Sequence, residues 1–201
     1  MKTYWIIGFL IAAGLPIHAK DCGVNVYVLA TVPMPDGVLL APAQSKAVAM
    51  FKEIGVNLRI KVGNPAHDTG DCGAPIVMQL DDSASYNGGR EALAYAAPYK
   101  TAGTCIHILL DRVMRRNRET GFISTLLAHV MVHEITHVLE QSMRHSEEGV
   151  MKARWNRQDY VRMNWHSLPF DPTDAEFVRE GAARRTHQPA VSKVADGNSP
   201  T

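Results

Sequence analysis

Apolar and polar residues alternate along several short stretches in the first half of the chain, which is the pattern of half-buried β-strands. Two of these stretches, 24–29 and 56–62, enclose apolar residues at helical spacing over 43–54. Pro42 and Gly55 mark the start and the end of that helix. Strand, helix and strand in this order predict a right-handed crossover between parallel strands. Further strands are predicted over 76–80, 92–99 and 106–110.

Two of the later strands carry local signals for their place in the sheet. The stretch 92–99 contains Pro98, which cannot donate a ladder hydrogen bond and therefore suits an edge strand. The stretch 106–110 is a continuous apolar run, which is typical of a central strand covered on both faces.

The second half of the chain is predicted to be mainly helical. A charged connector is expected over 111–121, before the longest helical pattern, 122–141, whose apolar side faces a core. One irregular helix is expected within 155–165. The last helix is expected to start at the N-cap Asp171 and to end near Arg185. The order of elements is therefore α/β first and helical last.

Composition places the chain among ordinary globular proteins. It has 201 residues, of which 46% are hydrophobic and 20% charged, and this excludes collagen-like, coiled-coil and wholly disordered classes. Residues 1–19, in which Lys2 precedes an apolar run, are typical of a secretory signal peptide cleaved near Ala19. Residues 20–185 are expected to form a single domain and residues 186–201 a disordered tail. No later apolar stretch approaches the roughly 18 residues of a membrane span, so we expect no membrane insertion of the mature chain.

Charge gives no sign of a nucleic-acid partner. The signal peptide holds one of the 21 basic residues and none of the 20 acidic ones, so the mature chain has no net charge. Nucleic-acid binding needs a basic surface, and it is not expected here. One local basic run is interpreted as a solvated face: Arg112, Arg115, Arg116 and Arg118.

The cysteine count agrees with export. An exported chain with three cysteines, here Cys22, Cys72 and Cys105, is expected to form one disulfide and keep one thiol. Cys72 and Cys105 both lie beside predicted strands, so we expect these two to pair.

The clearest chemical signal is the sequence HEITH at 133–137, inside the long helical pattern. His133 and His137 are one turn apart on the same helix face, so both imidazoles can reach one cation. Glu134 lies beside that cation without binding it, where it can act as a general base on water. The pentapeptide therefore predicts a metal site.

A catalytic zinc ion needs three protein ligands and one open position. His145, beyond the expected helix end, is the first candidate for the third ligand. Glu140 is its main rival, because it lies three residues after His137 on the same face. Glu176 or Glu180 of the last helix is the third choice, by analogy with sites of two histidines and a glutamate.

His129 lies one turn before the motif on nearly the same face. One role for such a residue is to hydrogen-bond to a metal ligand without binding the metal itself, but we interpret His129 as a hydrogen-bonded core histidine.

The stretch HEITHVLEQSMRH, followed by SEEGVMKARW, resembles the metzincin clan of zinc metallopeptidases. The clan's pattern is HExxHxxGxxH followed by a turn that places a methionine beneath the metal. Carried over by position, the resemblance implies that His133, His137 and His145 bind zinc, that Glu134 is the general base, and that Met151 is the methionine of the Met-turn.

The chain departs from the clan's pattern at two positions. Glu140 occupies the glycine position, and Met143 occupies the position of the third histidine. Assigning His145 as the third ligand therefore requires a turn two residues longer, and we expect the chain to reverse around Ser142 or Arg144.

The resemblance implies an α/β (α+β) fold with a mixed, mostly parallel twisted sheet, a long active-site helix, a Met-turn and a small C-terminal helical part. The stretch 92–99 corresponds to an antiparallel edge strand along which a peptide substrate pairs, and an exposed edge can bind a peptide in this way. The implied function is an exported zinc metalloendopeptidase, periplasmic or secreted, with one Zn²⁺ per chain and a peptide or protein substrate. Glu134 would take the proton of the attacking water and pass it to the leaving amine, while Tyr160 or His166 stabilises the oxyanion.

Two other classes of function remain open from the sequence. The chain could be a metal-binding protein of the same fold with little or no peptidase activity, or an exported binding protein whose histidines only build structure. The sequence does not indicate the oligomeric state.

Overall fold

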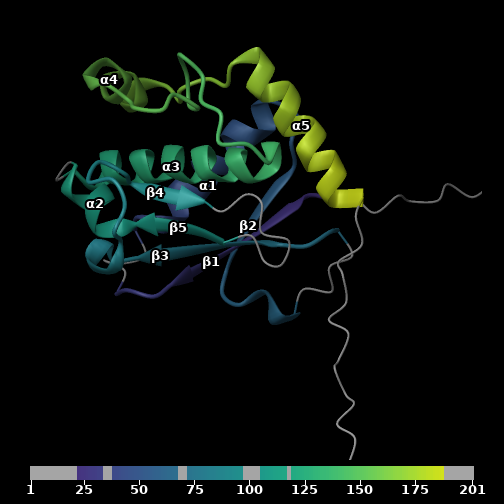
Figure 1. Ribbon diagram of the computed structural model, residues 1–201, viewed down its shortest axis with the longest axis horizontal. Helices are drawn as coiled ribbons and strands as arrows, with labels where there is room; N and C mark the ends of the chain where they lie inside the picture. The colour runs from purple at the N-terminus through teal and green to yellow at the C-terminus, as the bar shows by residue number, and fades with distance from the viewer. Residues whose placement is uncertain (1–21, 34–37, 68–71, 97–104, 117–118, 188–201) are drawn as a thin grey trace, which may run out of the picture.

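The computed structural model describes residues 22–33, 38–67, 72–96, 105–116 and 119–187 (Figure 1). The predicted signal peptide and residues 188–201 of the predicted tail lie outside the described residues.

Five strands of the described chain form one sheet with the order β2-β1-β3-β5-β4. The strands are β1 (Val24–Ala30), β2 (Leu58–Val62), β3 (Ile76–Asp81), β4 (Ala94–Ala96) and β5 (Cys105–Leu109). The pairs β1–β2, β1–β3 and β3–β5 are parallel, and β4 pairs antiparallel with β5 at the edge. The parallel crossover and the interior place of β5 are confirmed, and so is the antiparallel edge strand, within Ala94–Ala96. Residues 97–99 of that predicted strand, with Pro98, lie outside the described residues.

The helices follow the predicted order with one addition. They are α1 (Leu40–Glu53), α2 (Leu110–Arg115), α3 (Thr120–Glu140), α4 (Arg157–Trp165) and α5 (Pro172–His187). Two short 3-10 turns lie at Pro65–His67 and Ser83–Ser85.

The expectation of a charged connector over 111–121 was wrong, because α2 occupies its first part. Leu110 and Val113, three residues apart, are buried and give this helix its apolar side. Arg112 is not part of a solvated face either, since its Nη1 donates to Gly89 O (2.8 Å) and Ala92 O (2.9 Å). These bonds tie α2 to the segment just before the edge strand.

Helix α3 lies at the centre of the molecule. In Figure 1 it runs between the sheet and the C-terminal segment that carries α4 and α5, with α1 beside it. Among the described helices, α3 alone is long and apolar enough to cross a membrane, and 89% of that apolar window is buried inside the protein. The burial shows why a helix with a weak polar side forms here: it is covered on nearly every side by the fold.

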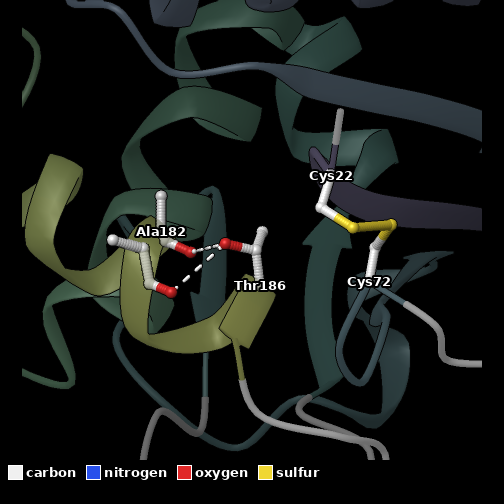
Figure 2. The surroundings of a disulfide bond; sticks show 5 residues. Cys22, Cys72, Ala182 and Thr186 are labelled. Carbon is white, nitrogen blue, oxygen red and sulfur yellow. Dashed lines mark hydrogen bonds between the residues drawn. A yellow bond between two sulfur atoms is a disulfide. The ribbon is translucent and has the colours of Figure 1, made fainter. Parts of the chain in front are cut away.

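The disulfide joins Cys22 to Cys72, so the expected pairing of Cys72 with Cys105 was wrong. The sheet register explains the difference. Val26 of β1 lies opposite Ile76 of β3, and each of the two bonded cysteines lies four residues before its strand partner. They therefore meet at the same end of the sheet, with Cα atoms 5.1 Å apart (Figure 2).

Helix α5 ends two residues beyond the predicted boundary. Thr186, expected in the disordered tail, is helical, and its Oγ1 donates to Ala182 O at 3.0 Å (Figure 2). Gly181 lies where α5 crosses the end of α3, and a Cβ there would collide with the carbonyl of Leu139. The close crossing of these helices brings α5 near the HEITH segment.

Candidate metal centre

The last two turns of α3 carry the HEITH residues. His137 is 2% exposed, and His133 is partly buried. Their Nε2 atoms lie 3.1 Å apart, close to the roughly 3.3 Å edge of a tetrahedron drawn around a zinc ion with nitrogen ligands at 2.0–2.1 Å. The one-turn spacing therefore brings both imidazoles to one point, as the sequence predicts.

The other nitrogen of each ring is held by a backbone carbonyl. His133 Nδ1 lies 2.9 Å from Val150 O, and His137 Nδ1 lies 2.9 Å from Ser142 O. A carbonyl oxygen only accepts, so both Nδ1 atoms carry hydrogen and donate. In the neutral rings both Nε2 atoms then present lone pairs, and these face each other at 3.1 Å.

Two facing lone pairs repel unless a positive charge lies between them. Burial lowers the pKa of His133 to about 3 and that of His137 to about 4, so protons do not fill this role at neutral pH. A metal ion can, because neutral imidazole is a metal ligand whose tautomer is set by the bond at the opposite nitrogen. The donor set is thus suited to a cation.

His145 joins the two helix histidines. Its ring centroid lies 5.3 Å from that of His133 and 4.9 Å from that of His137. One nitrogen from each of the three rings lies within 4.8 Å of the others. Three imidazoles with space for a fourth ligand suit a catalytic zinc ion.

The rival third ligands are not in this cluster. Glu140 is turned toward Arg144, with Oε1 3.5 Å from its Nη2. Glu176 and Glu180 are exposed on α5. The structure therefore groups His145, and none of the three glutamates, with the helix histidines.

The chain reverses after α3 at Gln141, and not at Ser142 or Arg144 as expected. Gln141 adopts the left-handed conformation (φ 52°, ψ 41°) and donates its N–H to His137 O. The next N–H, of Ser142, also points back to His137 O at 3.2 Å. A left-handed residue is the usual way to end a helix, and glycine is its usual occupant. Here the turn comes one residue after the clan's glycine position.

The segment predicted as the Met-turn orients one histidine of the site. Gly149 has a φ of 76° and leaves no space for a side chain against Pro169 O. Val150 donates its N–H to that same carbonyl at 2.9 Å, and the carbonyl of Val150 accepts a hydrogen bond from His133 Nδ1. Met151 is 1% exposed, and its carbonyl accepts from Ser146 N at 2.9 Å. The methionine is thus part of the turn that orients a histidine, and its place beneath a metal stays a prediction.

Glu134 lies beside the histidines with its carboxyl group buried. It is 7% exposed, and its Oε2 has no hydrogen-bond partner among the described residues. Burial raises the pKa of Glu134 to about 8. An unpartnered buried carboxyl group is costly to keep, and a nearby cation or a bound water would stabilise it.

A cleft of about 520 Å³ opens over these residues. Its lining includes Leu93, Ala94 and Tyr95 from the edge-strand region, and Trp155 and Tyr160 from the C-terminal segment. Of the two residues proposed to stabilise an oxyanion, Tyr160 lines the cleft, whereas His166 is exposed and lies outside the lining. Trp155 is half-buried, and its ring centroid lies 5.7 Å from that of His133. No local sequence signal distinguishes it from a core tryptophan.

His129 is a core histidine, as interpreted from the sequence. It is fully buried, its Nδ1 donates to Thr125 O (2.7 Å), and its Nε2 accepts from Leu168 N (3.0 Å). Both nitrogens are occupied by the protein backbone, so none is left for a metal.

In sequence, the chain matches no protein-family model and no curated protein. In structure, it is similar to an archaemetzincin from Methanopyrus kandleri, with a TM-score of 0.48 and 12% sequence identity. The match covers 84% of this chain and 100% of that chain. A likeness at this level says nothing about chemistry, which follows from the geometry of the site itself.

Proposed function

We propose that the protein is an exported zinc metallopeptidase with one Zn²⁺ per chain. The observation that carries this proposal is the pair of Nε2 atoms on His133 and His137, which face each other at 3.1 Å while both Nδ1 atoms donate to carbonyls. His145 supplies the third nitrogen. Neutral imidazoles oriented in this way present their lone pairs to a single point, as the ligands of a bound cation do.

Glu134 distinguishes a hydrolase from a simple metal binder. When bound, zinc supplies Lewis-acid polarisation of a carbonyl group and a lower pKa for water. Glu134 lines the cleft with an unpartnered oxygen. A cation held by the neighbouring histidines would lower its raised pKa and favour the carboxylate, which can then take a proton from the attacking water and pass it to the leaving amine. Tyr160 also lines the cleft, which supports a role for its hydroxyl as a donor to the developing oxyanion.

The cleft suits an extended peptide. Within the described part of the chain, β4 is an edge strand paired with β5, and its residues Ala94 and Tyr95 line the cleft. A peptide can add to such an edge through backbone hydrogen bonds. Export is supported by the predicted signal peptide together with the Cys22–Cys72 disulfide, since disulfides persist in oxidising compartments.

Zinc content and peptide cleavage by the mature protein and its Glu134→Gln variant test this function. We expect about one zinc ion per chain in both proteins. Cleavage of a library of quenched fluorogenic peptides should fall by at least about 10²-fold in the variant, which lacks the general base. Glu148→Gln, in an exposed position of the following loop, is the matched control and should keep both properties.

Each other result identifies a different error. Zinc without cleavage in the parent protein would favour a metal-binding protein with little or no peptidase activity. Unchanged cleavage in Glu134→Gln would exclude Glu134 as the base. No bound zinc in the parent protein would leave the histidine cluster with a structural role and contradict the proposal.

A further inference from the structure

The three histidines of the cluster are not held in the same way. His133 and His137 each donate from Nδ1 to a carbonyl, which fixes the orientation of the ring. No hydrogen bond joins the ring of His145 to another described residue, apart from its contacts with the two histidine rings. It also lies on an exposed loop position. Its place in the cluster must therefore come from the backbone that carries it.

The residues on both sides of His145 are bound to one carboxylate. Arg144 Nη2 lies 2.5 Å from Asp174 Oδ1. Ser146 Oγ lies 2.7 Å from Asp174 Oδ2 and 2.9 Å from Oδ1. Because both neighbours turn toward α5, the side chain between them turns away from α5 and toward the histidines of α3.

Asp174 is well placed to serve as a fixed anchor. It is 1% exposed in the first turn of α5, where the helix dipole stabilises a negative charge. A charge-assisted bond to arginine is among the stronger hydrogen bonds of a protein. We call the bonds of Arg144 and Ser146 to Asp174 the brace. Two backbone N–H groups strengthen it, since Arg144 N donates to Ser142 Oγ and Ser146 N donates to Met151 O. Ser142 and Met151 thus connect the brace to the turns on either side of it.

We propose that Asp174 is a positioning residue of the metal centre, which fixes His145 opposite His133 and His137 by holding Arg144 and Ser146. This inference rests on the proposed function, because it assumes that the cluster binds a metal. Among the described residues the carboxylate of Asp174 hydrogen-bonds to Arg144 and Ser146 and to none of the three rings. Its charge also acts on His137 through space, but its bonded contacts reach the cluster only through the 144–146 segment.

The chain offers a matched control in Asp111 of α2. Asp111 Oδ2 accepts from Ser83 Oγ at 2.6 Å and lies 2.6 Å from Arg115 Nη2. It is therefore another carboxylate that holds one serine and one arginine, and neither partner is next to a histidine of the cluster. Asp111→Asn removes the same kinds of bond as Asp174→Asn without touching the loop of His145.

The experiment measures the zinc dissociation constant of the mature protein by competition with a chelating dye. We expect Asp174→Asn to weaken zinc binding by about 10- to 100-fold, as the loss of an outer partner of a metal ligand does. Asp111→Asn should leave the constant within about twofold of the parent. A double-mutant cycle gives the decisive readout: in a His145→Ala background, Asp174→Asn should cause no further loss, because the ligand that it positions is gone.

A general loss of structure predicts different results. It would weaken binding equally in the two backgrounds, and such additivity would overturn the inference. Unchanged zinc affinity in Asp174→Asn would also overturn the inference. If the parent protein binds zinc in that case, the proposed function stays intact. A parent protein without zinc would overturn both. If Asp174→Asn does not fold, Ser146→Ala removes one of the two links and should show the same non-additivity with a smaller loss.

Discussion

Helix α3 carries two kinds of histidine within three turns. His129 gives both ring nitrogens to the backbone, donating to Thr125 O and accepting from Leu168 N. His133 and His137 give only Nδ1 to a carbonyl and direct Nε2 toward each other. Residue type, helix and face are nearly the same, so the difference comes from what covers the helix. A histidine whose second nitrogen has no protein partner is available for chemistry.

The covering segments differ in kind at the two positions. The segment just before α5 lies over His129 and supplies the N–H of Leu168. The 142–150 segment passes His133 and His137 and supplies carbonyls only. An N–H donor occupies the nitrogen that a metal would need, whereas a carbonyl fixes the ring and leaves that nitrogen open.

The largest effect is expected from removing one histidine of each kind. We expect His133→Asn to weaken zinc binding by more than the roughly 10- to 100-fold typical of losing an outer partner of a ligand, because it removes a ligand itself. His129→Asn should change the dissociation constant by less than about threefold, since neither of its nitrogens faces the cluster. Competition titration with a chelating dye measures both. Equal losses in the two variants would remove the distinction between the two kinds of histidine.

Part of the site depends only on residues that are close together in the sequence. The positions of His133, Glu134 and His137 follow from helix periodicity alone, and the structure brings the two histidines together as that periodicity predicts. The order of strands and helices, apart from α2, was also predictable, because each of these elements has its own apolar pattern.

Other features depend on contacts between distant segments, and local patterns do not show them. The Cys22–Cys72 disulfide follows from the register of β1 against β3, which is known only once the sheet is formed. The brace on His145 joins residues to Asp174 across 28 and 30 positions. Trp155 is a cleft residue only because α4 and the loop before it lie over α3.

A second effect concerns stability and isolates the histidine that is bonded at both nitrogens. Burial lowers the pKa of His129 to about 4 from its ordinary 6.5. Between these two pH values the unfolded chain therefore binds a proton at His129 that the folded chain does not bind. The folded state is therefore favoured most above pH 6.5, and this contribution is lost as the pH falls toward 4. A shift of this size corresponds to about 3 kcal/mol.

Urea unfolding of the metal-free protein at pH 7 and pH 4 measures this contribution. We expect the free energy of unfolding of the parent to fall more steeply with acid than that of His129→Asn, by about 3 kcal/mol over this range. The variant loses stability at pH 7, because Leu168 N is left without its acceptor. Parallel pH profiles would show that His129 is not the neutral, doubly bonded histidine described above.

The smallest effect is expected at the residue that separates α3 from the loop of His145. Gln141 holds a left-handed conformation, which costs a non-glycine residue about 1–2 kcal/mol. Glycine removes that cost but gives the unfolded chain more freedom, which offsets about 0.4–1 kcal/mol. Gln141→Gly should therefore raise the free energy of unfolding by about 0.5–1 kcal/mol, as measured by urea unfolding of the metal-free protein. Gln141→Ala, which keeps the cost, should give no gain. Because the backbone path to His145 is unchanged, zinc affinity should stay the same in Gln141→Gly. A loss of affinity there would mean that the loop depends on the glutamine side chain as well as on the anchor at Asp174.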